Sequence, residues 1–187
     1  MLNDTRVFEA NSQGGGAFGD LPEWDLSDLY ASEDAAELQA DLTWLKQSCI
    51  DFSNDYEGKL AQLNADEMLK AVERYEAIDI IAGRIMSFAG LRYYQLTTDP
   101  ERAKFMSDMQ DKLTEHTTKL VFYGLEFNRL DEEALSKLLS QNTALARYKP
   151  VFDRMRAMKP YQLSDEMEKF LHDQSVVGAT AWNRLFD

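Results

Sequence analysis

Apolar residues recur three and four positions apart over most of the chain, and this spacing is typical of amphipathic helices. After Ser32, one stripe of side chains could face a neighbouring helix: Leu38, Leu42, Leu45, Cys49, Phe52 and Tyr56. Ser32 is the expected N-cap of this helix, and Gly58 is the expected left-handed residue at its end. No stretch shows a convincing alternation of period two, so the pattern predicts an all-α fold.

The middle of the chain predicts a long antiparallel helical hairpin. Asn64 and Glu67 have capping-box spacing, and helical periodicity runs from there to about Leu96. Asp99, as N-cap before Pro100, then starts a third helix. One apolar stripe follows it: Phe105, Met109, Leu113, His116, Leu120, Tyr123 and Phe127. Because the connection is short, the two helices should pack side by side in an elongated helical bundle.

Two glycines lie seven residues apart in the second predicted helix. A glycine inside a helix costs up to about 1 kcal/mol relative to alanine. Gly83 and Gly90 would lie on one side of the helix, beside Ala82 and Ala89. We therefore expect another helix to approach closely there, and we weigh a ligand site at this position below that packing role.

Shorter helices are predicted beyond the hairpin. They cover residues 131–141, about 143–157, a segment capped by Ser164, and a segment after Gly178. The last of them carries apolar residues at helical spacing, namely Ala179, Trp182, Leu185 and Phe186. No glycine, asparagine, basic turn or proline closes it. This open end fits either a natural terminus or one piece of a longer polypeptide.

The acidic composition disfavours nucleic acids and anionic membranes as partners. The chain has 187 residues, 44% of them apolar, which suits one domain with a sizeable core. Its net charge of −13 opposes binding to phosphates. One basic stretch, residues 147–159, runs against this trend. It is either a solvated face or a positive wall that attracts an acidic group on a partner domain or a peptide.

The first twenty residues predict a flexible leader rather than a signal peptide. They contain a run of three glycines and lack both a basic segment and an apolar segment. No apolar run approaches the roughly 18 residues of a membrane-spanning helix. A single cysteine, Cys49, cannot form an internal disulfide, which favours the reducing cytoplasm.

Few residues could carry chemistry. His116 lies on an apolar stripe, where a core or interface histidine is the default. His172 follows Glu168 by four residues, so the two could form a surface pair or, less plausibly, two metal ligands. Cys49 fits a small core residue. With no nucleophile elbow, phosphate loop or dinucleotide fingerprint present, the sequence assigns no catalytic, cofactor-binding or metal residue.

Several motifs in a fixed order resemble one family. LPEWDLSDLY, at residues 21–30, is similar to the opening Trp-Asp-Leu-x-x-Leu-Tyr of oligoendopeptidase F, a thimet-oligopeptidase-like zinc peptidase. FSNDYEGKL, TTDPERA, LARYKPVFDRMRAMKPYQLSDEMEKFL and the final GATAWNRLFD follow in the family's order. The resemblance covers residues 21–187, which we assign to an N-terminal helical domain behind the leader of residues 1–20.

The resemblance implies hydrolysis of short peptides by a cytoplasmic zinc metallopeptidase. The family's catalytic motif is His-Glu-x-x-His on a helix, with a further Glu as third zinc ligand. The surroundings of the two histidines, TEHTTKL and FLHDQSV, do not contain this motif. No metal or catalytic residue therefore transfers to this chain. Zinc would belong to the parent enzyme, and this chain would form a wall of its substrate channel and be inactive alone.

Two hypotheses of different class remain. In the first, the chain is the N-terminal region of such a peptidase, and its partners are short peptides and a C-terminal catalytic domain. Trp182, Leu185 and Phe186 should then be partly exposed or covered by a second copy, and Arg92, Tyr93 and Tyr94 are candidates for the channel lining. In the second, the chain is a self-sufficient helical interaction module without catalysis.

Overall fold

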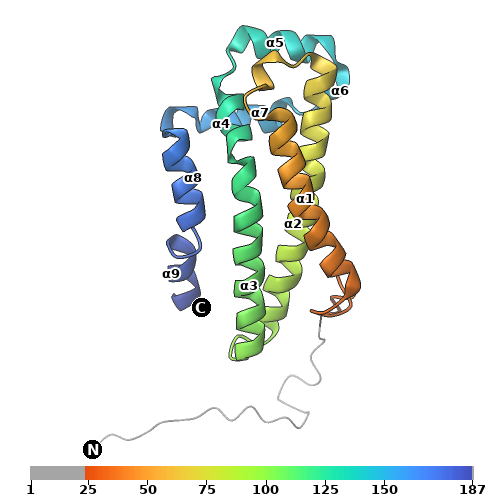
Figure 1. Ribbon diagram of the computed structural model, residues 1–187, viewed down its shortest axis with the longest axis vertical. Coiled ribbons are helices and arrows are strands. Elements are labelled where there is room, and N and C mark those ends of the chain that lie inside the picture. Colours follow the sequence, from red (N-terminus) through yellow and green to blue (C-terminus); the bar gives the residue numbers. More distant parts are fainter. Residues whose placement is uncertain (1–23, 187) are drawn as a thin grey trace, which may run out of the picture.

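The computed structural model describes residues 24–186, and within that range every regular element is helical (Figure 1). The predicted all-α class is confirmed. Three long helices, α1 (Ala36–Tyr56), α2 (Ala65–Gln95) and α3 (Pro100–Thr117), run side by side along the long axis of the molecule. The expected leader, residues 1–20, lies outside the described residues.

Helix α1 begins later than expected. Ser32 donates its hydroxyl to Asp34 at 2.7 Å, so it belongs to a turn that precedes the helix. Ala35 is the residue at the N-cap, and its side chain makes no capping hydrogen bond. The prediction of a Ser32 cap was wrong, because the helix starts only at Ala36, beyond the reach of a cap at Ser32. At the other end, Gly58 has a φ of 78°, so the predicted left-handed residue is confirmed.

The long hairpin is formed by α2 and α3 as predicted. Asn64 accepts from the backbone of Glu67, and the Glu67 carboxylate accepts from the backbone of Asn64, which completes the capping box. Asp99 caps α3, and Pro100 lies in its first turn. These two local signals set the ends of a helix pair with a short connection.

The two glycines of α2 do not mark a close helix contact, contrary to our expectation. Gly83 is exposed, and a methyl group added there would meet nothing within 4 Å. Gly90 is buried, but its nearest neighbour is Tyr94 of the same helix, at 3.7 Å. Spacing placed both glycines on the packed side, but only Gly90 is buried, and no other described helix lies against it.

The apolar stripe from Phe105 to Phe127 is split between two helices. A 3₁₀ turn at Thr118–Leu120 separates α3 from α4 (Val121–Arg129). The hydroxyls of Thr117 and Thr118 donate to carbonyls one turn earlier, each at 2.8 Å. Such back-bonding bends helices, so it accounts for the break that apolar periodicity could not reveal.

Three short helices close one end of the bundle: α5 (Glu132–Gln141), α6 (Thr143–Ala146) and α7 (Lys149–Ala157). The helix expected over 143–157 is thus two helices. Pro150 lies in the first turn of α7, where its missing N–H costs nothing. Asn142 ends α5 and also caps α6, since its side chain accepts from two backbone amides.

The chain then turns back along the bundle as α8 (Asp165–Gln174) and α9 (Ala179–Phe186). Both lie beside α3 in Figure 1, on the side away from α1. Ser164 caps α8 as predicted, because its hydroxyl accepts from Met167. The start of α9 directly after Gly178 is also confirmed.

An aromatic cluster forms the centre of the core. Phe52 of α1 is fully buried, and its ring centroid lies 5.9 Å from that of Tyr75, 5.8 Å from Phe122 and 5.6 Å from Tyr123. Tyr75 and Tyr123 stack at 4.5 Å. The cluster joins α1, α2 and α4. The apolar stripe predicted for α1 is therefore its core-facing side, with Tyr56 half-buried at the margin.

We predict that Phe52→Ala lowers the free energy of unfolding by about 3–5 kcal/mol, because it removes the ring that three helices share. Denaturant unfolding followed by circular dichroism measures this. Trp44→Ala, at an exposed position of the same helix, is the matched control and should have a much smaller effect. Equal losses for the two variants would contradict the assigned core.

Candidate functional site

The motif segment at the start of the described chain is fastened to α1 and α2 by one polar contact set. The Tyr30 hydroxyl donates to Asp41 at 2.6 Å, and Arg84 donates to the same carboxylate at 3.1 Å. Arg84 also donates to the Leu29 carbonyl, and its guanidinium lies 4.2 Å from the centroid of the Tyr30 ring. Burial first, and the Asp41 carboxylate second, raise the pKa of Tyr30, so its hydroxyl stays a donor.

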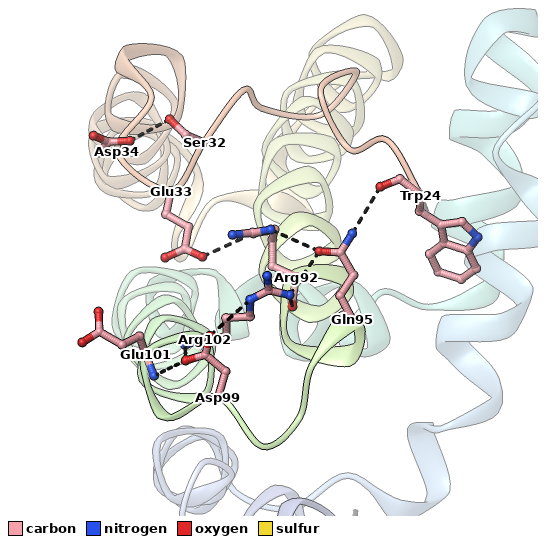
Figure 2. Close-up of polar contacts among 9 residues, drawn as sticks. All are labelled: Trp24, Ser32, Glu33, Asp34, Arg92, Gln95, Asp99, Glu101 and Arg102. Atoms are coloured by element: carbon pink, nitrogen blue, oxygen red, sulfur yellow. Dashed lines mark hydrogen bonds and ion pairs between the residues drawn. The ribbon is translucent and has the colours of Figure 1, made fainter. Parts of the chain in front are cut away.

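A second polar network lies where α2 turns into α3 (Figure 2). Arg92 donates to Glu33 at 3.3 Å and to Gln95 Oε1 at 3.1 Å. Arg102, from the first turn of α3, donates to the same Gln95 oxygen at 3.3 Å and forms an ion pair with Asp99 at 3.5 Å. Two guanidinium groups thus converge on one neutral amide oxygen.

Two hollows border this network, and both are lined by Trp24, Arg92, Gln95 and Arg102. The first, about 600 Å³, lies between the network and residues 24–34, and acidic side chains line much of it. The second is about 740 Å³ and is lined by Trp24, Leu91, Arg92, Tyr94, Gln95, Leu96 and Arg102. We call it the hairpin-end groove. Among the described residues, its lining includes two arginines and no acidic side chain. The same two arginines also border the first hollow, where Glu33, Asp99 and other acids lie.

Helix α8 packs on the bundle through its polar side. Asp165 pairs with Arg129, and Lys169 pairs with Glu57 at 3.1 Å. His172 Nε2 lies 3.2 Å from the Thr117 hydroxyl. Thr118 donates to Asp173 one residue further on. All of these contacts are polar, and within the described chain no residue of α8 is buried.

The apolar side of α8 faces away from the bundle. Met167, Phe170 and Leu171 are all exposed, and at 100° per residue they lie opposite Asp165, Lys169 and His172. We call these three residues the outer face of α8. An amphipathic helix normally buries its apolar side. A contiguous exposed apolar patch of this kind marks an interaction surface.

Helix α9 continues this exposure. Trp182 is 70% exposed and Leu185 is 75% exposed. The predicted partial exposure of the last helix is confirmed for these two residues, whereas the side chain of Phe186 lies outside the described set.

His116 is half-buried on α3 and does not suit a metal ion. Burial lowers the pKa of its imidazole, Glu115 raises it, and three lysines, Lys46, Lys112 and Lys119, lower it further. Positive neighbours oppose a bound cation as well as a proton. His116 lies at the edge of the core stripe, near the place that its spacing predicted.

His172 does not use Glu168 in the way that their spacing suggested. The Glu168 carboxylate accepts from the backbone of Leu163 at 2.8 Å, while His172 contacts Thr117. His172 also borders a hollow of about 370 Å³ between α2 and α4, together with Tyr75 and Asp79. Across residues 24–186, no three His, Cys, Asp or Glu side chains come together as a metal-ligand set.

Cys49 is fully buried, and burial raises the pKa of its thiol to about 11. The thiolate is scarce at neutral pH, so Cys49 is the core residue that its position on the stripe predicted. In the described part of the chain, none of the helices has the length and apolar character that a membrane crossing needs.

The basic stretch 147–159 is only partly a solvated face. Arg156 turns inward and donates to Glu132 at 2.7 Å and to the Leu130 carbonyl at 2.9 Å, so it closes the end of α4. Lys149 pairs with Asp153 one turn along α7. These two cations therefore serve the fold.

The arrangement defines an all-α domain with a ligand-sized groove and an uncovered apolar helix face. A family model described as Oligopeptidase F matches residues 126–187. Oligoendopeptidase F, plasmid, of Lactococcus lactis subsp. cremoris is 25% identical over 155 residues, 81% of this chain and 25% of that protein. Oligopeptidase PepF of Bacillus subtilis (strain 168) is 25% identical over 166 residues, 86% of this chain and 23% of that protein.

A third relative, the oligoendopeptidase F homolog of Lactococcus lactis subsp. lactis (strain IL1403), is 25% identical over 79% of the chain and 24% of its own length. No solved structure gives a significant match. The resemblance to the N-terminal region of the oligoendopeptidase F family, inferred from the motifs, is confirmed. The chain spans about a quarter of the length of the curated relatives it matches.

Sequence reasoning missed the partners of the arginines. It singled out Arg92 and Tyr94 but not Gln95, the last residue of α2. It also missed Glu33, which is distant in sequence, and Arg102, which lies beyond the turn. The useful signal was the TTDPERA helix start, because it places Arg102 one turn after a tight connection, close to the end of α2.

We predict that Tyr30→Phe lowers the free energy of unfolding by about 1–2 kcal/mol, since it removes one charge-assisted hydrogen bond to Asp41. Tyr94→Phe is the control, because that side chain is exposed. Denaturant titration compares the two. If both variants match the unchanged protein, the anchoring role of the motif tyrosine is refuted.

Proposed function

We propose that this chain is the N-terminal helical region of a zinc metallo-oligoendopeptidase that hydrolyses short peptides in the cytoplasm. In this proposal the chain forms a wall of the substrate channel. The His-Glu-x-x-His centre lies in a further part of the polypeptide, and this chain alone neither binds zinc tightly nor cleaves peptides. The names of the relatives support the peptidase class, and the share of their length that the chain spans supports a larger parent protein.

The outer face of α8 carries the proposal. Phe170 and Leu171 project from a helix that already uses its polar side to bind the bundle. Burying one such side chain contributes about 1.5–3 kcal/mol, so a second domain that covers the face would gain substantial free energy. A catalytic domain in the same polypeptide is the occupant that fits the greater length of the relatives.

Lys46, Lys112 and Lys119 surround His116, and His172 faces a threonine. The catalytic zinc of the parent enzyme would accordingly take its ligands from elsewhere. In this proposal, the chain contributes two hollows and an exposed apolar helix face to the parent enzyme.

The self-sufficient interaction module, our second hypothesis, needs the same face to stay exposed or to bind a separate protein. The two hypotheses differ in what covers Phe170 in the natural protein. One informative result is a substitution that leaves the stability of the isolated chain unchanged but lowers that of the natural protein. This result indicates that another part of the same polypeptide covers Phe170.

We therefore predict that Phe170→Asp changes the stability of the 187-residue chain by less than about 0.5 kcal/mol, because the side chain is exposed there. In the complete natural protein the same change should lower the melting temperature and peptide hydrolysis, since it buries a charge in an apolar contact. Thermal unfolding and cleavage of a fluorogenic peptide measure both effects.

Ile80→Asp is the control, because Ile80 is an exposed apolar residue of α2 that lies outside the outer face of α8. It should have similarly small effects in both proteins. The proposal fails if Phe170→Asp is as mild as Ile80→Asp in the complete protein. It also fails if the purified 187-residue chain shows zinc-dependent cleavage of its own.

A further inference from the structure

We propose that the hairpin-end groove binds the C-terminal carboxylate of a short peptide whose last residues are apolar. Arg92 and Arg102 hold the carboxylate, and Trp24, Tyr94 and Leu96 contact the apolar side chains. The inference deepens the proposed function, on which it rests for the choice of a peptide as ligand. It assigns one end of that peptide to named residues of this chain.

The two guanidinium groups share one neutral acceptor, and each also pairs with one carboxylate, Glu33 or Asp99. Gln95 Oε1 accepts from Arg92 at 3.1 Å and from Arg102 at 3.3 Å, but this oxygen is neutral. Arginine forms strong, often bidentate hydrogen bonds with carboxylates and phosphates. An incoming carboxylate would find donors from both side chains, and guanidinium nitrogens can grip its two oxygens at once.

The acids nearby only partly neutralise this pair. Glu33 lies 3.3 Å from Arg92, and Asp99 lies 3.5 Å from Arg102. Each guanidinium has five N–H donors, and these ion pairs use only part of them. In Figure 2 these acids approach from the side of residues 32–34 and from the turn, away from Trp24. The described lining of the groove adds no further acid to these two.

Partial burial makes the pair more effective than surface arginines. The Arg92 side chain is 32% exposed and the Arg102 side chain is 22% exposed. Electrostatic attraction is stronger in such a site than in bulk water because the effective dielectric constant is lower. The backbone also holds Arg102 in position, since its Nη1 donates to the Arg92 carbonyl at 3.2 Å.

The rest of the lining selects a ligand with apolar parts. Trp24 is 66% exposed, although Gln95 Nε2 donates to its carbonyl at 3.2 Å and so fixes its backbone. Tyr94 and Leu96 are also exposed beside the arginines. An apolar surface next to a fixed cationic pair suits the last residues of a peptide, where a carboxylate and a side chain share one α-carbon. The groove, at about 740 Å³, is large enough for more than one residue.

The test compares two peptides of one sequence, Gly-Gly-Ser-Gly-Leu-Phe, one with a free C-terminal acid and one with a C-terminal amide. Isothermal titration with the 187-residue chain measures both affinities, so no catalysis is needed. We expect the acid to bind about tenfold or more tightly than the amide, because only the acid offers a charged acceptor. This comparison changes the ligand alone and is independent of any effect of a variant on folding.

Variants then locate the effect. Arg92→Gln and Arg102→Gln should each weaken binding of the acid and abolish its advantage over the amide. Glu33→Gln should strengthen binding of the acid, because a competing carboxylate is removed. Arg74→Gln is the matched control, since Arg74 is another ion-paired arginine of α2 that does not line the groove, and it should leave both affinities unchanged. Trp24→Ala should weaken binding of the acid peptide and of the amide peptide equally.

Equal binding of acid and amide would overturn the inference. So would a preference for the acid that survives in both arginine variants. A third arm uses the amide peptide with an internal glutamate, and binding as tight as that of the free acid would refute recognition of the C-terminus. These outcomes leave the proposed function standing. Conversely, a natural protein that ends near Asp187 would remove the proposed function without affecting the measured binding.

Discussion

The structure depends on the burial of Phe52 between three helices. Its ring contacts Tyr75 of α2 and Phe122 and Tyr123 of α4, so one side chain of α1 links segments up to 71 positions apart in the sequence. The stacking of Tyr75 on Tyr123 then brings α4 against α2 at the end of the bundle. At the end of the hairpin, Arg92 and Arg102 both donate to Gln95.

Different parts of the molecule are held together by apolar and by polar contacts. The bundle of α1, α2 and α3 is held by its core, whereas α8 is held by ion pairs and hydrogen bonds. Exposed pairs of this kind contribute roughly 0.2–1 kcal/mol each, far less than a buried ring. The outer face of α8 therefore has more free energy to gain from a new contact than α8 gains from its present one. This imbalance connects the fold to the proposal of a larger parent protein.

The local part of the fold was predictable from the sequence. The capping box at Asn64, the helix start at Asp99 and the left-handed Gly58 were all identified, because each depends on residues only a few positions apart. The wrong predictions also concern local contacts, where a side chain had more than one possible hydrogen-bond partner. Ser32 bonded to Asp34 instead of a helix end, and Thr117 and Thr118 turned one expected helix into two.

The candidate sites were less predictable, because they depend on long-range pairing. Periodicity shows that α8 has a polar and an apolar side, but it cannot show that the polar side faces the bundle. Likewise, Gln95 receives hydrogen bonds from two arginines only because the turn folds α3 back beside α2. Gly83 also shows that spacing alone cannot identify contacts between helices. Its spacing suggested a close contact, but no side chain or backbone of another described helix lies near it.

The most direct test of the central claim is the intact mass of the natural protein, purified from its source and measured by mass spectrometry under denaturing and native conditions. The account predicts a polypeptide several times heavier than the 21.5 kDa of this chain, with zinc retained in the native spectrum. A natural polypeptide of about 21.5 kDa without zinc would contradict it.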